Sequence, residues 1–186
     1  MAHDKTKMMM IIAMFAALIS ILAQVTIPLP LIPITGQTLA IGLTATILGS
    51  KNGSLAVLVY LLLGLIGLPV FASFSSGFGV LFGPTGGFLI GFIPTAFITG
   101  LWLEKTTYTY WNAIIANLIG VCISLSFGVI WLKVAGSLSW HAAFLSGALP
   151  FIPVGIIKAL LAAWLGILIR QRLTMAKLLP SKVQTM

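Results

Sequence analysis

The chain of 186 residues is 60% hydrophobic and only 6% charged, whereas about a quarter of the residues of an ordinary soluble domain are charged. This composition excludes a soluble globular protein and indicates an integral membrane protein. The formal net charge of +8 does not indicate nucleic-acid binding, because the basic residues are scattered between apolar runs, as membrane topology would place them.

The apolar runs predict an all-α membrane protein with six transmembrane helices in a single domain, residues 1–186. A spanning helix needs about 20 mainly apolar residues, fewer where it is partly interfacial. In chain order the predicted spans are 8–26, 34–49, 53–69, 84–103, 110–132 and 150–169. The first span follows two lysines, as a signal peptide would, but it has no convincing small-residue cleavage site. We therefore interpret it as an uncleaved span.

Charged and aromatic residues predict that both termini are cytoplasmic. With this orientation, Lys133 is the only lysine or arginine in an outer loop, and eight other basic residues face the cytoplasm. Aromatic residues at the predicted interfaces agree with it: Trp102, Tyr108, Tyr110 and Trp111 inside, Trp131 and Trp140 outside. The outer loops, about 27–34, 70–83 and 133–149, are longer than the inner ones, so we expect a binding site that opens outward.

Lys158 is the one charged residue of the last predicted span and lies in the outer half of that span. It could extend its ammonium group to the interface, as lysines near helix ends do. Alternatively, it faces the bundle and binds an anionic ligand. The second interpretation is favoured, because both acidic residues, Asp4 and Glu104, are assigned to the cytoplasmic side. A ligand carboxylate would then neutralise Lys158.

Several polar residues at the outer ends of the spans are candidates for the same pocket. They are Thr35, Gln37, Ser75, Ser76 and Thr85. Each could instead cap a helix or face water. Asn117 lies deeper, in the fifth span, where an interhelical hydrogen bond is the simpler role and ligand binding the alternative.

Small residues recur at four-residue steps in two spans. The segment GPTGGFLIGF (83–92) lacks the Gly-Lys-Ser/Thr ending of a phosphate-binding loop, so nucleotide binding is rejected. Instead, the span that begins in this segment carries small residues at four-residue steps, a spacing that predicts close helix packing: Gly87, Gly91, Thr95 and Thr99. In the first span, Ala13 and Ala17 form a similar step, for which internal packing is the simpler explanation and an external partner helix the alternative.

The predicted spans also lack the groups that several functions require. They contain no carboxylate or histidine, which argues against a proton-coupled transporter. No nucleophile–base pair or metal-binding cluster is apparent, so we expect no catalytic residue, no metal and no cofactor. The chain is therefore expected to be a binding protein with its energy source elsewhere. A partner-independent secondary transporter and a membrane scaffold remain alternatives.

Three segments together resemble the BioY family, the biotin-binding S components of energy-coupling factor (ECF) transporters. They are PLPLIPITGQTLAIGL (28–43), VLFGPTGGFLIGF (80–92) and LPFIPVGIIKALLAA (149–163). The resemblance implies a six-helix S-component fold in a prokaryotic cell membrane, which captures biotin from outside for ATP-driven uptake. It also implies a transmembrane coupling protein, contacted through Ala13 and Ala17, and two cytoplasmic ATPases that consume the ATP.

The chain departs from the family pattern at the ring end of the implied pocket. The last-helix motif of the family usually has an aspartate where Gly155 stands, whereas its lysine, near the biotin carboxylate, is retained as Lys158. Phe88 replaces a frequent tyrosine, and Ser75 an arginine seen in some members. Biotin is the first expectation. Lipoate is the second, because its dithiolane ring needs no hydrogen-bond partner and its tail carries the same carboxylate.

Overall fold

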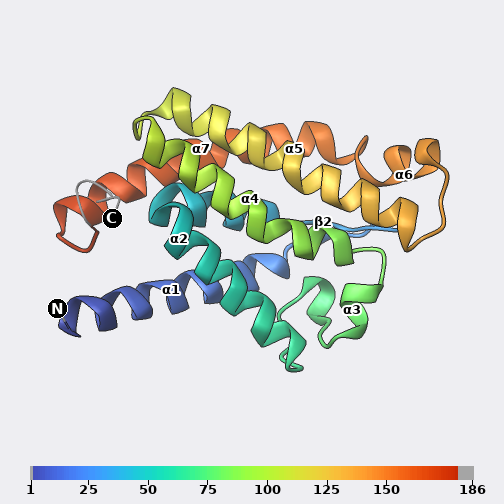
Figure 1. Ribbon diagram of the computed structural model, residues 1–186, viewed down its shortest axis with the longest axis horizontal. Helices are drawn as coiled ribbons and strands as arrows, with labels where there is room; N and C mark the ends of the chain where they lie inside the picture. The colour runs from blue at the N-terminus through green and yellow to red at the C-terminus, as the bar shows by residue number, and fades with distance from the viewer. Residues whose placement is uncertain (1, 180–186) are drawn as a thin grey trace.

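The computed structural model describes residues 2–179 and consists mainly of long helices that run along one another (Figure 1). In chain order the elements are α1 (Ala2–Ala23), β1 (Thr26–Ile27), β2 (Ile34–Thr35), α2 (Gln37–Leu65), the 3₁₀ helix η1 (Ala72–Phe74), α3 (Gly79–Phe82), α4 (Gly86–Lys105), α5 (Tyr110–Val134), α6 (Trp140–Gly147) and α7 (Phe151–Met175). Within these described residues, five helices are long and apolar enough to cross a membrane: α1, α2, α4, α5 and α7. The predicted multi-pass helical fold is confirmed at this level.

Several predicted boundaries differ from those of the structure. Helix α1 begins at Ala2 and α7 continues to Met175, because hydropathy marks only the lipid-embedded part of a helix, whereas backbone hydrogen bonding continues into the polar flanks. The start of the second predicted span forms strand β2 instead, paired antiparallel with β1. Helix α6 lies in a segment expected to be a loop, and the Oγ atom of Ser139 caps it by accepting a hydrogen bond from the Ala142 amide at 3.1 Å.

The predicted spans 34–49 and 53–69 belong to one element, α2, which reverses direction at Gly49. This residue has φ +82° and ψ −170°, which glycine adopts without strain. A Cβ built on Gly53 would lie 3.1 Å from the Ala45 Cα, whereas eight residues of continuous helix span about 12 Å. Helix α2 therefore has two arms, 37–48 and 50–65, and Figure 1 shows the second returning towards the end from which the first came.

A group of four side chains, the hinge cluster (Ser50, Glu104, Tyr108 and Arg170), surrounds this reversal. The Ser50 amide and hydroxyl donate to the two carboxylate oxygens of Glu104 at 2.7 and 2.6 Å. This carboxylate satisfies a free N–H at the start of the second arm, where negative charge is favourable. The buried Arg170 of α7 donates to the Ile47 carbonyl and lies 3.7 Å from the Tyr108 ring centroid. The cluster thus joins α2, α4 and α7.

Tyr108, in the connection between α4 and α5, lies between the two charges of the hinge cluster. Burial raises the pKa of its hydroxyl to about 12, an effect that the positive charge of Arg170 opposes and the negative charge of Glu104 reinforces. The phenol therefore stays neutral at physiological pH, and its ring offers Arg170 a cation–π contact.

Helices α4 and α5 pack through the predicted small residues. Cβ atoms built on Gly87 and Gly91 would lie 2.6 Å from the Phe127 carbonyl oxygen and 2.7 Å from its Cβ, respectively. About two turns further along α4, the Thr99 hydroxyl donates to the Ala116 carbonyl at 3.3 Å. The four-residue spacing therefore marks the contact face of α4, and this packing prediction is confirmed.

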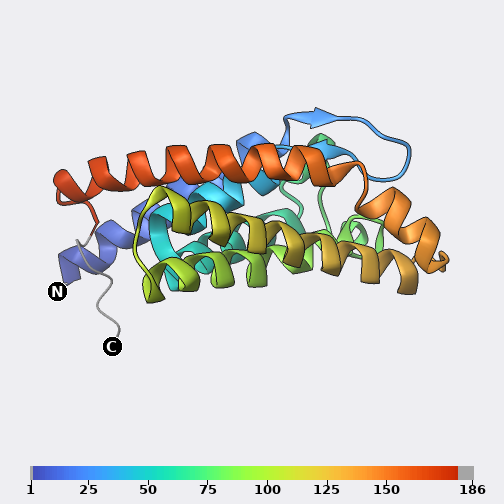
Figure 2. The same cartoon turned by 90° about the horizontal axis from the view of Figure 1, so that it is seen from above.

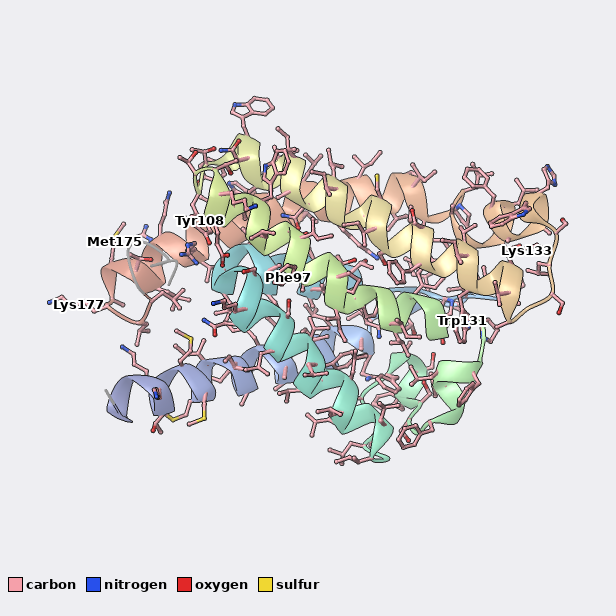
Figure 3. The ribbon with its side chains drawn as sticks, viewed as in Figure 1. Phe97, Tyr108, Trp131, Lys133, Met175 and Lys177 are labelled. Atoms are coloured by element: carbon pink, nitrogen blue, oxygen red, sulfur yellow. The ribbon has the colours of Figure 1, made fainter. Side chains whose placement is uncertain are left out.

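The bundle has two distinct ends. The beginning of α1 and the end of α7 lie at the same end (Figure 2), and the Lys7 Nζ donates to the Lys177 carbonyl at 2.6 Å. We call this the terminal end, which also holds Tyr108, and the opposite one, with Trp131 and Lys133, the loop end (Figure 3). The chain thus leaves the bundle on the side at which it enters.

Candidate ligand-binding site

A cavity of about 230 Å³ lies between β2, α2, α4, α5 and α7, under the segment that contains η1 and α3. Its walls are mainly apolar, with aromatic side chains from Phe71, Phe88, Phe92 and Phe151. Its polar lining residues are Thr35, Gln37, Thr38, Ser75, Thr85, Ser124 and Lys158. An apolar cavity with a few convergent polar groups is typical of a small-molecule site.

The structure brings together seven of the nine residues predicted for the pocket. These lining residues are Thr35, Gln37, Ser75, Thr85, Phe88, Gly155 and Lys158. They come from four distant parts of the chain, which the fold places around one cavity. Ser76 and Asn117 do not line the cavity.

Lys158 points into the bundle from α7. Its Nζ donates to the Thr35 carbonyl at 2.6 Å and to the Thr38 Oγ1 at 3.3 Å. A lysine ammonium has three donors, so one N–H remains for a ligand. Since the side chain contacts the start of α2 and lines the cavity, it does not extend along the lipid-facing surface.

Among the residues that the structure describes, no carboxylate lies beside Lys158. Glu104, one of the two acidic residues of the chain, binds Ser50 in the hinge cluster at the terminal end. The other, Asp4, lies in the first turns of α1, and its side chain is outside the described residues. A carboxylate brought by a ligand would therefore meet an uncompensated cation in a mainly apolar cavity, where a charge-assisted hydrogen bond is strong.

A chain of hydrogen bonds supports the polar side of the cavity. The Thr35 hydroxyl donates to the Gln37 Oε1 at 2.7 Å, and the Gln37 Nε2 donates to the Tyr60 hydroxyl at 2.5 Å. Both Gln37 and Tyr60 are buried. Tyr60 lies on the second arm of α2, so the reversal at Gly49 positions it behind Gln37. Sequence reasoning missed Tyr60, although a tyrosine in an apolar run is expected to find a polar partner.

Phe88 and Gly155 form apolar parts of the wall. The Phe88 ring packs against the Phe151 ring, with centroids 5.9 Å apart. A Cβ built on Gly155 would lie 3.0 Å from the Val121 Cγ1 of α5, closer than ordinary van der Waals contact. Gly155 therefore allows α5 and α7 to approach, and α7 presents no polar side chain at this level.

Asn117 occupies a position between helices, away from the cavity. Its Nδ2 donates to the Thr46 Oγ1 and to the Ala113 carbonyl, both at 2.9 Å. The amide joins α5 to the first arm of α2, so the prediction that it lines the pocket is corrected in favour of the interhelical hydrogen bond. Asn117 lies one helix turn further from the loop end than Val121, which lines the cavity. Its position deeper in the span therefore places it outside the cavity wall.

The difference between Ser75 and Ser76 follows from local backbone geometry. Ser75 has an extended conformation, φ −76° and ψ 159°, and neighbouring side chains of extended backbone point in opposite directions. Ser75 lines the cavity, with its hydroxyl donating to the Ala72 carbonyl at 2.7 Å, and Ser76 does not. Two further lining residues, Thr38 and Ser124, are absent from the predicted set, because the sequence does not show which face of a buried helix meets a cavity.

A multi-pass helical fold with an apolar cavity and an uncompensated lysine defines a membrane protein that binds a small anionic ligand. The BioY family model matches residues 1–175. The chain is 41% identical to the biotin transporter BioY2 of Lactococcus lactis subsp. cremoris, over 90% of this chain and 92% of that protein. It is 40% identical to the biotin transporter BioY of Thermotoga maritima, over 84% and 92%, respectively. The chain belongs to the BioY family.

A solved structure agrees with this assignment. The crystal structure of the S-component for biotin from an ECF-type ABC transporter superposes with a TM-score of 0.84 and 31% sequence identity. The match covers 92% of this chain and 94% of that one. The predicted family and the S-component fold are therefore confirmed.

Proposed function

We propose that the chain is the S component of an ECF-type importer and captures biotin from outside the cell. The observation that carries this proposal is Lys158, which has one N–H left for a ligand in the cavity and no carboxylate partner among the described residues. Its ammonium pairs with the carboxylate of the vitamin, and the apolar walls enclose the ring. Membership of a family of biotin transporters supports the assignment as a multi-pass membrane transport protein rather than an enzyme.

We further propose that the chain crosses the membrane six times, with both termini in the cytoplasm. The described part of the chain has five long helices, and the reversal at Gly49 makes two arms of α2. An even number of crossings agrees with the position of α1 and α7 at the same end of the bundle. Lys177 lies at the terminal end and Lys133 at the loop end (Figure 3), as the positive-inside rule requires. Lys7 contacts Lys177, and Lys105 ends α4 three residues before Tyr108, which also lies at the terminal end. The cavity then opens outward.

Lipoate is the second candidate ligand, and the apolar wall at Phe88 and Gly155 favours it. Equilibrium titration of the purified, ligand-stripped protein with biotin and lipoate in parallel tests both. We expect saturable biotin binding with one ligand per chain. Binding of lipoate without biotin would replace the first candidate by the second. Binding of neither would show that the proposed function is wrong.

The energy for uptake comes, in this proposal, from a coupling protein and two ATPases, since no ATP-binding motif is present in this chain. Ala13 and Ala17 are both exposed on α1, which corrects the simpler expectation that they pack inside the bundle. Large apolar residues on the same helix are also exposed, including Met14 at 70%. We propose that the small residues of this face contact the coupling protein.

A double substitution, Ala13→Leu with Ala17→Leu, is expected to abolish ATP-dependent biotin uptake. The two larger side chains prevent close approach of a partner helix, but they lie outside the cavity, so biotin affinity stays within about twofold. Uptake is measured in proteoliposomes that contain the coupling protein and both ATPases. Ile157→Leu, on an exposed position of α7, is the control. Normal uptake and normal co-purification of the double variant would exclude this face as the interface.

A further inference from the structure

Ser124 of α5 has a buried hydroxyl that no group of the described residues satisfies. The side chain is 3% exposed. Within the described part of the chain, three buried side-chain oxygen atoms lack a hydrogen-bond partner, those of Ser54, Tyr108 and Ser124, and Ser124 alone of these lines the cavity. A buried polar atom without a partner costs free energy, so its presence in a ligand cavity points to the ligand as its partner.

The lack of a partner has a local cause. A serine hydroxyl inside a helix commonly donates to the carbonyl four residues earlier. Ser126, on the same helix, does so, with 2.8 Å from its Oγ to the Cys122 carbonyl oxygen. For Ser124 the corresponding acceptor is the Gly120 carbonyl, which already accepts the Thr95 hydroxyl of α4 at 3.4 Å. The Ser124 hydroxyl is therefore left without a partner among the described residues, beside the cavity that this residue lines.

The position of Ser124 complements the rest of the cavity. It lies one turn along α5, about 4.5 Å, from Val121, the residue that faces Gly155. Opposite this part of α5, α7 has Gly155 and so provides no polar side chain. On the other side, Thr35 and Gln37 are engaged with each other, and Lys158 binds the Thr35 carbonyl. The serine is thus an uncommitted hydrogen-bonding group on an otherwise apolar wall.

We propose that the Ser124 hydroxyl donates a hydrogen bond to the carbonyl oxygen of the cyclic urea of the ligand and so selects for that ring. This assignment rests on the proposed function, because it takes biotin as the ligand. Lys158 holds the carboxylate, and Ser124 recognises the ring. A dithiolane ring offers no comparable acceptor, so the serine separates the two candidate vitamins.

The test compares Ser124→Ala with Ser126→Ala, a matched change one half-turn away and outside the cavity. Each purified protein is titrated with biotin and with 2′-thiobiotin, whose sulfur is a weaker acceptor than the urea oxygen. We expect Ser124→Ala to bind biotin about 5- to 10-fold more weakly than the native protein. We also expect it to lose most of the native preference for biotin over 2′-thiobiotin. Ser126→Ala should change neither quantity more than about twofold.

Thermal unfolding of the ligand-free proteins distinguishes recognition from a structural role. Because the native hydroxyl is unsatisfied without ligand, Ser124→Ala should unfold at the same temperature or about 2–4 °C higher. A biotin affinity within twofold of native, an unchanged preference for biotin, or a lower unfolding temperature would each overturn the assignment. In those cases the native protein still binds biotin, so the proposed function stands. Absence of biotin binding by the native protein overturns both.

Discussion

Lys158→Ala is expected to weaken biotin binding about 100-fold or more. The native ammonium has one N–H for the ligand, and no carboxylate in the described part of the chain pairs with it. Removing one partner of a buried, hydrogen-bonded charge pair costs about 2–5 kcal/mol, much of it because the other charge stays buried and unpaired. Isothermal titration of the detergent-purified protein measures this loss directly.

Two controls isolate the charge interaction at Lys158. Lys133→Ala, at the loop end and outside the cavity, should bind biotin like the native protein. Biotinamide, which lacks the carboxylate, should bind the native protein weakly, and Lys158→Ala should bind biotin and biotinamide with similar affinity. If the alanine variant retained biotin affinity within threefold of native, the lysine would serve only to hold the Thr35 carbonyl, and the carboxylate would need another partner.

Glu104→Ala is expected to lower the free energy of unfolding by about 3 kcal/mol, because it breaks the hinge cluster. The variant loses both hydrogen bonds from Ser50 and leaves the buried Arg170 without a nearby negative charge. For a chain of this size the unfolding temperature should fall by about 6–12 °C. Thermal unfolding in detergent, followed by circular dichroism, is the measurement.

Glu104→Gln and Lys105→Ala are the matched controls for this second prediction. The glutamine keeps one acceptor for Ser50 but removes the charge, so we expect a smaller loss. Lys105 is the exposed neighbour at the end of α4, and its replacement should shift the unfolding temperature by no more than about 1 °C. An unfolding temperature of Glu104→Ala equal to that of Lys105→Ala would show that the reversal at Gly49 does not depend on the carboxylate.

Sequence reasoning was most successful where a property depends on local composition. Hydropathy located every long helix of the structure, and the four-residue spacing of Gly87 and Gly91 identified the contact face of α4. Lys158 was found because a charge in an apolar run is costly. The polar residues of the cavity were predicted from their position at the outer ends of the predicted spans. Each of these inferences needs only neighbours along the chain.

Predictions failed where the direction of a side chain decides its role. Ser76 follows Ser75 directly, but backbone alternation turns it away from the cavity. Asn117 and Ser124 are both polar residues of α5, and only helix packing determines that the first joins α2 and the second meets the cavity. Tyr60 contacts Gln37 only after α2 reverses.

The sequence by itself determined that this protein is a multi-pass membrane protein of the BioY family with an uncompensated lysine near one end of its last helix. Hydropathy and charge balance suffice for the membrane class and for Lys158, because the cost of placing a charge in lipid depends on composition and depth. The family followed from the resemblance of three segments. Only the tertiary structure decided that Gly49 reverses α2, that Lys158 binds the start of that helix, and that the Ser124 hydroxyl has no partner within residues 2–179. These properties depend on which groups from distant segments come within hydrogen-bond distance, and packing sets those distances.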